Sequence, residues 1–215
     1  MSDRGLNSAD TSRPSARHAV ALGLVLLSVT VVGAALGGVT AAESQSSPVE
    51  ISNWTDLDDI RNNPGADYIL VNDLNETTPG YETVAGPNAN GGKGFDPIDG
   101  FPDGFNGSFD GQGNSIANLT IDRSSENEVG LFEYTSGGAV IEEVILTGAT
   151  VTGSNRVGGL VGTNDGGAVS NSSASGAVNA TGIGYDNSDV GGLVGYNYGG
   201  TVSSSSASGA VNATG

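Results

Sequence analysis

A repeated segment in the C-terminal part of the chain limits the possible folds more than any other feature. Residues 157–182 read VGGLVGTNDGGAVSNSSASGAVNATG, and they recur as residues 190–215 at a spacing of 33 residues. Only four of the 26 aligned positions differ: Thr163/Tyr196, Asp165/Tyr198, Ala168/Thr201 and Asn171/Ser204. Self-similarity at this spacing is typical of stacked arrays in which each unit covers the apolar edge of the next. We therefore predict one repeat with its spacer at 157–189 and a second at 190–215.

Glycine-rich turns divide each copy into short runs, which favours strands of roughly five residues over helices. The chain has 36 glycines in 215 residues, which suits repeated tight turns and not helix interiors. The runs 159–162, 169–175 and 177–181 predict a three-sided coil, so the fold class is all-β, a right-handed parallel β-helix (β-solenoid). Stacking would align Asn164 with Asn197 as an asparagine ladder, and Ser172 with Ser205 as a hydroxyl ladder.

Two tetrapeptides within the repeats resemble a known motif. Gly159-Leu160-Val161-Gly162 and residues 192–195, again GLVG, resemble the GLUG motif, and residues 105–121, FNGSFDGQGNSIANLTI, resemble the segment that commonly precedes it. A fainter copy at 129–140, VGLFEYTSGGAV, carries Glu133 in place of the last glycine. The resemblance to GLUG-motif repeat proteins implies an exported, surface-located or adhesin-like protein of bacterial or haloarchaeal type. It does not imply a particular ligand.

The N-terminal region contains an export or anchoring signal. Residues 19–39 are apolar and uncharged, and three arginines precede them, which places residue 43 onward outside the cell. Small residues ending at Ala42 supply a cleavage site, so residues 1–42 are predicted to be a signal peptide of the general secretory route, or else a membrane anchor. A mature N-terminus near Ala42 would establish cleavage.

The sequence between this signal and the repeats predicts four further segments. Residues 43–49 form a linker, 50–128 an N-terminal cap with the first β-helix coils and a loop insertion at 77–104, and 129–156 a degenerate repeat. A capping helix is expected with Thr55 or Asp56 as its N-cap, and Trp54, Leu57 and Ile60 would close the first coil. We expect four apolar side chains to hold the insertion against the body: Phe95, Ile98, Phe101 and Phe105.

Composition removes several classes of chemistry. The lone histidine, His18, lies in the signal or anchor segment and the chain has no cysteine, so zinc sites and Ser-His-Asp or Cys-His catalysis are not available to the exported part. A net charge of −17 argues against nucleic-acid binding. We therefore predict no catalytic, cofactor-binding or metal-ligating residues and no cofactor. Turn positions explain most of the clustered carboxylates, although calcium binding or glycosidic chemistry are alternatives. They are Asp96, Asp99, Asp103 and Asp110.

Tyrosines and sequons supply the candidate contact sites. Tyr185, Tyr196 and Tyr198 gather around the second repeat, where exposed aromatic rings could stack on sugars. Seven N-x-S/T sequons are possible N-glycosylation sites. They are Asn53, Asn75, Asn106, Asn118, Asn171, Asn179 and Asn212.

These observations predict a non-catalytic exported cell-surface module for adhesion or for binding envelope polysaccharides. Its expected partners are cell-envelope polymers or other surface molecules, not nucleic acid, and it would contact the membrane only through an uncleaved N-terminal segment. The alternative is a polysaccharide-active lyase or hydrolase that uses carboxylates. Because the chain stops directly after a repeat, we expect it to be part of a longer protein.

The charge distribution predicts that stability depends on salt. Residues 43–143 hold 19 acids against Arg61, Lys93 and Arg123, so self-repulsion should loosen this half at low ionic strength. Molar salt shortens the screening length to about 3 Å. Circular dichroism across a salt series should therefore show a higher unfolding midpoint above about 2 M than at about 0.1 M salt. Equal midpoints would contradict a halophilic adaptation.

Overall fold

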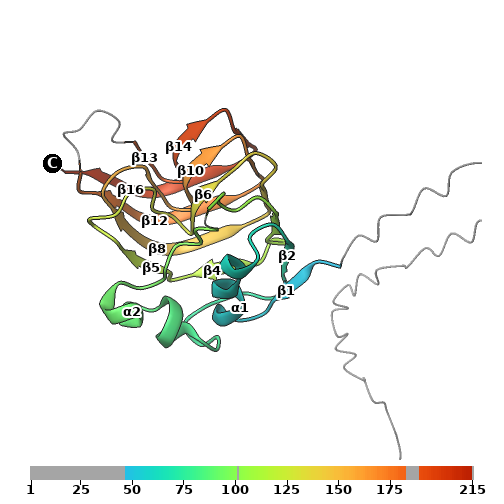
Figure 1. The fold of residues 1–215 in the computed structure, drawn as a ribbon. Helices are drawn as coiled ribbons and strands as arrows, with labels where there is room; N and C mark the ends of the chain where they lie inside the picture. Colours follow the sequence, from blue (N-terminus) through green and yellow to red (C-terminus); the bar gives the residue numbers. More distant parts are fainter. Residues whose placement is uncertain (1–46, 101, 183–188, 215) are drawn as a thin grey trace, which may run out of the picture. The chain divides into compact units, whose positions relative to one another are not determined.

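The computed structural model describes residues 47–100, 102–182 and 189–214, and these form a parallel β-solenoid of about three turns with few helices. The strands stack in layers along one axis, as Figure 1 shows. The all-β parallel solenoid predicted from the repeats is therefore confirmed, whereas its right-handedness stays a prediction. No helix among the described residues is long and apolar enough to cross a membrane. The predicted signal or anchor, residues 1–42, lies outside the described residues.

Three parallel sheets form the sides of the solenoid. Sheet A has the order β1 (Val49–Ile51), β2 (Asp67–Leu70), β3 (Ser108–Asp110), β7 (Val140–Glu142), β11 (Ala168–Ser170) and β15 (Thr201–Ser203). Sheet B contains β4 (Ser115–Ala117) and β5 (Thr120–Asp122), which both pair with β8 (Ile145–Gly153), followed by β12 (Ser173–Ala180) and β16 (Ser206–Ala213). Sheet C contains β6 (Phe132–Thr135), β10 (Val161–Asp165) and β14 (Val194–Tyr198). A two-stranded pair, β9 (Val157–Gly158) and β13 (Val190–Gly191), precedes the last two strands of sheet C.

The 33-residue repeat sets the register between the last two coils. Val161 pairs with Val194, Ala168 with Thr201 and Ser173 with Ser206. The degenerate repeat forms the preceding coil at a shorter offset, since Phe132 pairs with Val161 and Val140 with Ala168. Corresponding side chains therefore stack directly above one another along the solenoid.

Asparagine and serine columns run through the stack. Asn164 donates from Nδ2 to Asn197 Oδ1 at 2.8 Å and accepts a hydrogen bond from Thr135 Oγ1 at 2.8 Å, which confirms the asparagine ladder and extends it by one coil. The expected hydroxyl ladder of Ser172 and Ser205 does not form, because the two hydroxyls do not bond to each other. Ser172 Oγ accepts the amide of Val144 at 3.1 Å, and Ser205 Oγ accepts the amide of Ser172 at 3.1 Å, so each hydroxyl satisfies a backbone donor of the preceding coil.

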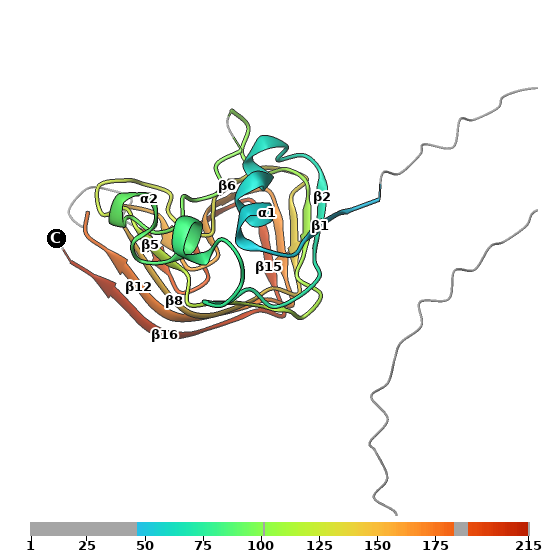
Figure 2. The ribbon, with the colours of Figure 1, turned by 90° about the horizontal axis from the view of Figure 1, so that it is seen from below.

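The strand boundaries inside each repeat differ from the sequence prediction at two points, Asn171 and Gly176. The expected run 169–175 is broken at Asn171, whose φ of 49° turns the chain from sheet A to sheet B. The expected break at Gly176 is instead a bend within the continuous strand β12, where φ is 137°. Figure 2 shows the strands of sheet B bending in this way. Residue types alone do not distinguish a bend within a continuously paired strand, as at Gly176, from a turn that ends a strand, as at Asn171.

A short helix stands at the N-terminal end of the stack. Helix α1 (Trp54–Asp58) continues into the 3-10 helix η1 (Asp59–Asn62), and Trp54, Leu57 and Ile60 are completely buried in the core. The expected N-cap at Thr55 or Asp56 is wrong: the side chain of Asn53 accepts the amides of both residues, at 2.9 and 3.0 Å. Asparagine is a strong cap because its short amide reaches the first free N–H groups. That α1 acts as the cap of the solenoid stays a prediction.

The loop insertion packs against the body through apolar side chains. It contains a π-helical turn, η2 (Tyr81–Ala85), and α2 (Ala89–Gly92). Phe95, Ile98 and Phe105 are fully buried, as expected, while Phe101 lies outside the described residues. Ile98 and Phe105 each pair with β6, so the insertion also supplies the layer beneath sheet C.

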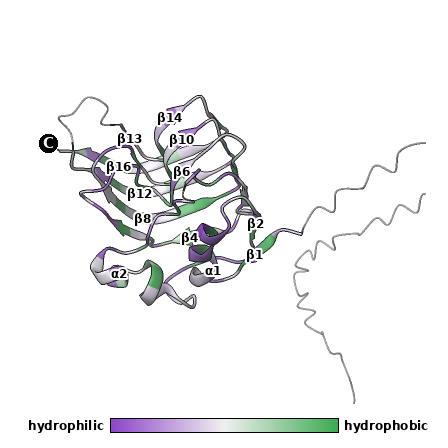
Figure 3. Ribbon diagram, viewed as in Figure 1, coloured by the Kyte–Doolittle hydropathy of each residue, from purple (hydrophilic) through white to green (hydrophobic). Residues whose placement is uncertain are grey.

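Close backbone contacts between coils explain the glycines of the repeat. In residues 159–162, Leu160 and Val161 are fully buried in the core. A Cβ on Gly159 would lie 2.5 Å from the carbonyl oxygen of Gly192, and one on Gly162 would lie 2.3 Å from the carbonyl carbon of Glu128. The pattern glycine, two buried apolar residues, glycine is therefore what this stacking geometry requires. Figure 3 shows hydrophobic and hydrophilic residues interspersed along the strands of the solenoid.

Replacing Gly162 with alanine should destabilise the solenoid by about 1–3 kcal/mol, because the added methyl group collides with backbone that cannot move aside cheaply. Gly137→Ala is the matched control, since a Cβ there meets no atom within 4 Å. Denaturant unfolding at fixed salt measures both variants. Equal losses of stability in the two variants would contradict the steric explanation.

Candidate functional site

One side of sheet C carries the polar and aromatic side chains that are best placed to meet a ligand. Tyr134, Thr163 and Tyr196 occupy equivalent positions in β6, β10 and β14, and Asp165 pairs with Tyr198 in the next column. Tyr198 is 62% exposed, while Thr163 is buried between its neighbours. We call Tyr134, Asp165, Arg156, Tyr196 and Tyr198 the tyrosine surface.

Direct contacts order this surface. The rings of Tyr196 and Tyr198 stack with centroids 6.3 Å apart and planes 13° apart. The Arg156 guanidinium lies over the Tyr196 ring, 4.9 Å from its centroid, and forms an ion pair with Glu128. A cation over the ring face and a stacked neighbour both restrict the tyrosine, which lowers the entropy lost when a ligand binds.

Tyr134 acts as a fixed hydrogen-bond donor. Its hydroxyl donates to Asp165 Oδ2 in the next coil. This hydrogen bond, and then burial, raise the pKa of Tyr134 to about 12. The phenol therefore stays protonated under any physiological condition, and Asp165 is held beside Tyr198.

An acidic pocket adjoins the tyrosine surface. It has a volume of about 280 Å³ and is lined by Asp99, Pro102, Gly104, Glu128, Glu133 and Tyr134. The pocket exists because Glu133 stands where the next coil has Gly162, and the layer beneath it is the loop between Ile98 and Phe105 instead of a regular coil. Burial, and then the negative charges of Asp99 and Glu128, raise the pKa of Glu133 to about 7. Glu133 thus exchanges a proton near neutral pH.

The structure divides the carboxylates that the sequence had grouped. Asp99 lines the acidic pocket, whereas Asp96 pairs with two arginines and Asp110 Oδ1 accepts the Gln112 amide at 2.8 Å, as a turn residue does. Asp103 is exposed and is not part of the pocket lining. Within the described ranges, no group of three or more acidic or histidine side chains is arranged to hold a metal ion.

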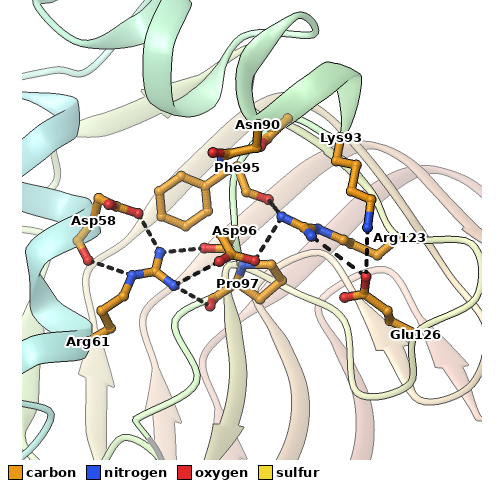
Figure 4. Close-up of polar contacts among 10 residues, drawn as sticks. Asp58, Arg61, Asn90, Lys93, Phe95, Asp96, Pro97, Arg123 and Glu126 are labelled. Carbon is orange, nitrogen blue, oxygen red and sulfur yellow. Dashed lines mark hydrogen bonds and ion pairs between the residues drawn. The ribbon is translucent and has the colours of Figure 1, made fainter.

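Three basic residues form a network that joins the insertion to the body, as Figure 4 shows. Arg61 pairs with Asp58, donates to the Asp96 carbonyl at 2.8 Å and lies 6.0 Å from the Phe95 ring centroid. Arg123, which is 8% exposed, reaches Asp96 at 2.7 Å and Glu126 at 3.6 Å. Lys93 reaches Glu126 at 3.4 Å. Together with Arg156, all four basic side chains of the described residues are engaged in ion pairs, which leaves the outer surface acidic.

The predicted contact residues fall into two groups. Tyr196 and Tyr198 come together as expected, while Tyr185 lies outside the described residues. Sequence reasoning missed Tyr134, Glu133, Arg156 and Glu128. The degenerate repeat contains a signal for two of them, because Glu133 aligns with Gly162 and Tyr134 with Thr163 once the coils are in register. The contacts of Arg156 depend on where the chain enters β9.

The seven sequons occupy different environments. Asn53 caps helix α1, Asn75 accepts two hydrogen bonds from Thr77, and Asn212 donates to Asn179 at 3.0 Å across sheet B. The remaining three asparagines, Asn106, Asn118 and Asn171, are exposed outside the strands. The predicted cleavage site at Ala42 lies outside the described residues.

Comparison with known proteins gives one motif match and one similar protein. A model of the GLUG motif matches residues 153–179 and 186–212. The chain carries two GLUG motifs. Halomucin of Haloquadratum walsbyi (strain DSM 16790 / HBSQ001) is 40% identical over 141 residues, which cover 62% of this chain and 2% of halomucin. No solved structure gives a significant match.

These matches confirm the resemblance to GLUG-motif repeat proteins that was noted in the sequence. Together with the structure they indicate a β-solenoid that is similar in sequence to a segment of halomucin. The chain spans only a small fraction of the length of the relative it matches.

The raised pKa of Glu133 predicts a local pH effect on stability. The folded state holds this proton up to about pH 7, whereas the ordinary pKa is 4.5, so folding binds the proton between these values. The contribution of Glu133 to the free energy of unfolding should therefore be most favourable below pH 4.5, fall as the pH rises to about 7 and stay low above it.

Comparison of the chain with its Glu133→Gln variant isolates this effect from the other carboxylates. Unfolding at pH 5 and pH 8 in high salt should show that the variant loses less stability than the parent on going to pH 8. Parallel pH profiles for the two proteins would contradict the assignment.

Proposed function

We propose that this chain is part of an exported, non-catalytic cell-surface β-solenoid that binds envelope polysaccharides through the tyrosine surface. The observation that carries the proposal is the stacked pair Tyr196 and Tyr198. Two of the four differences between otherwise identical coils place these rings side by side, where the preceding coil has Thr163 and Asp165. Such a change affects the outer surface and leaves the coil geometry intact.

The chemistry of the surface suits a sugar chain. An exposed phenol ring offers an apolar face to the C–H groups of a pyranose, and its hydroxyl offers a hydrogen bond. Asp165 and Arg156 add an acceptor and a donor within the same patch. Sugar-binding sites of this open kind are expected to be weak individually, and repetition along a polymer raises the overall affinity.

Charge favours a neutral polymer over an acidic one. The net charge is −17, and Arg156, the only basic residue of the tyrosine surface, is already paired with Glu128. Polyanions would therefore be repelled at low ionic strength. We infer that neutral hexose or N-acetylhexosamine polymers are the preferred ligands.

Export follows from the N-terminal sequence. The apolar run 19–39, preceded by arginines and followed by the small residues before Ala42, supports transfer through the general secretory route. The similarity to halomucin supports the same location. Adhesion to other cells is a further role that this placement would allow.

One observation favours the alternative, a polysaccharide-active enzyme. Glu133, with its pKa near 7, and Asp99 line the same pocket, and glycosidases use a protonated acid paired with a second carboxylate. The halomucin and GLUG matches weigh against it. The test of the proposal therefore measures cleavage as well as binding.

Retention on a panel of immobilised neutral polysaccharides, in molar salt, tests the binding proposal. The double variant Tyr196→Thr/Tyr198→Asp gives the last coil the residues of the coil before it, so the fold should be kept while retention falls at least about tenfold, as expected when about 1.4 kcal/mol of binding is lost. Thr201→Ala, also taken from the preceding coil, is the matched control and should bind like the parent.

Unchanged retention in the double variant would contradict the tyrosine surface as the binding site. Release of reducing or unsaturated ends from any polymer, abolished by Glu133→Gln or Asp99→Asn, would replace the binding module with an enzyme. Asp103→Asn and Asp110→Asn serve as controls because neither residue lines the pocket.

A further inference from the structure

We propose that N-linked oligosaccharides are attached at Asn106, Asn118 and Asn171, and not at the other four sequons. A sequon asparagine can carry a glycan in the folded protein only if its amide projects into solvent without a structural role. The structure separates the seven sequons by this criterion. The inference rests on the export half of the proposed function and is independent of the tyrosine surface.

Asn118 and Asn171 stand at corners of the solenoid. Their φ values of 59° and 49° are left-handed, a conformation that asparagine tolerates better than most residues. Asn171 turns the chain from β11 into β12, and Asn118 separates β4 from β5. Both residues are exposed at these corners, and neither side chain makes a hydrogen bond within the described residues. The Oδ1 atom of Asn118 lies beside Gly148 of β8.

Asn106 lies at a third corner, between the Phe105 bridge to β6 and strand β3. Its side chain is exposed, while its backbone amide is fixed by the carbonyl of Pro64 at 3.1 Å. The sequon is therefore held at the surface, with Asn106 Oδ1 beside Gly65 and no side-chain hydrogen bond to another described residue.

The other four asparagines use their side chains to hold the structure. Asn53 Nδ2 donates to Asp56 Oδ2 at 2.8 Å while its Oδ1 caps helix α1. Asn75 is half-buried and accepts the amide and hydroxyl of Thr77 at 2.9 and 2.7 Å. Asn179 and Asn212 are bonded to each other within sheet B, one strand apart, where an attached sugar would break the pair and crowd the adjacent strand.

The modification is a simple group transfer. The Nδ2 atom of the asparagine forms a bond to the anomeric carbon of an oligosaccharide, and the bond from that carbon to the phosphate oxygen of a polyprenyl-phosphate donor breaks. The amide loses one proton to the transferase or solvent, the lipid phosphate leaves with the bonding electrons, and nothing is oxidised or reduced.

The three sites leave the ligand surface uncovered. None of the three asparagines belongs to β6, β10 or β14, the strands of the tyrosine surface. Glycans at these sites would be attached at corners of the solenoid, outside the strands of sheet C. They would also add hydrated bulk to a surface that already relies on carboxylates for solubility.

The repeats contain a natural control at one site. Ser204 occupies the corner equivalent to Asn171, with the same φ of 49°, and is followed by Ser205 and Ser206. Ser204→Asn would thus create a sequon in the same local structure. In a background that lacks the Asn171 sequon, this variant should gain a glycan.

The experiment expresses the full chain in an archaeal host that transfers lipid-linked oligosaccharides to exported proteins, and in a matched strain without the transferase. Intact mass and glycopeptide mass spectrometry count the attached chains, and added protease on whole cells scores export of residues 43–215. Acceptor hydroxyls are removed, leaving each asparagine in place, with Ser108→Ala, Thr120→Ala and Ser173→Ala, and Thr214→Ala is the control for the Asn212 sequon.

We expect three oligosaccharides on the parent, the loss of one with each of the three acceptor variants, no change with Thr214→Ala, and a gain of one when Ser204→Asn is added to Ser173→Ala. An exported chain that carries no glycan, or carries one at Asn53, Asn75, Asn179 or Asn212, would overturn the assignment and leave the binding proposal untouched. A chain that is not exported would overturn both this assignment and the export half of the proposed function.

Discussion

The structure depends on the distance at which two coils can meet at sheet C. Parallel strands pair only when their backbones approach within hydrogen-bonding distance, and at Gly162 the preceding coil comes so close that no side chain fits. Leu160 and Val161 between the glycines then fill the interior. Where the sequence departs from this rule, at Glu133, the layer beneath is irregular and a pocket opens. One steric constraint therefore accounts for both the regular stack and the acidic pocket beside Glu133.

Most ion pairs of the described residues lie where the insertion meets helix α1 and the segment after β5. The network of Arg61, Lys93 and Arg123 binds the insertion to helix α1 and to the segment after β5, and Asp96 is shared by both arginines. Outside this network, Glu128 is the one acid of the described residues that forms an ion pair, with Arg156. Salt should therefore stabilise the protein, because it strongly screens the repulsion between exposed carboxylates. It weakens the ion pairs of Arg123 much less, because that side chain is nearly buried.

Features of the repeats could be predicted from the sequence, whereas contacts between segments of different sequence could not. The 33-residue spacing, the glycine pattern and the Asn164–Asn197 ladder follow from identity between copies, because identical copies in register stack identical residues. The cap at Asn53, the bend at Gly176 and the position of Arg156 over Tyr196 could not be predicted, because each depends on backbone angles or on a partner from another segment. Tyr134 was missed for a related reason: its equivalence to Tyr196 becomes visible only after the offset between coils changes from 33 residues to 29.

The uniform step between the last two coils has a genetic consequence. Every strand of one coil pairs with the strand 33 residues later, so a gene segment encoding those residues can be copied or deleted in frame without changing the neighbours of any other coil. Val169 and Val178 are 1% and 5% exposed beneath the following coil, whereas their counterparts Val202 and Val211 are 42% and 48% exposed, so each added copy buries the same pair again. Near-identical copies are also good substrates for recombination. Length can thus evolve in whole coils, at a nearly constant gain in stability per copy.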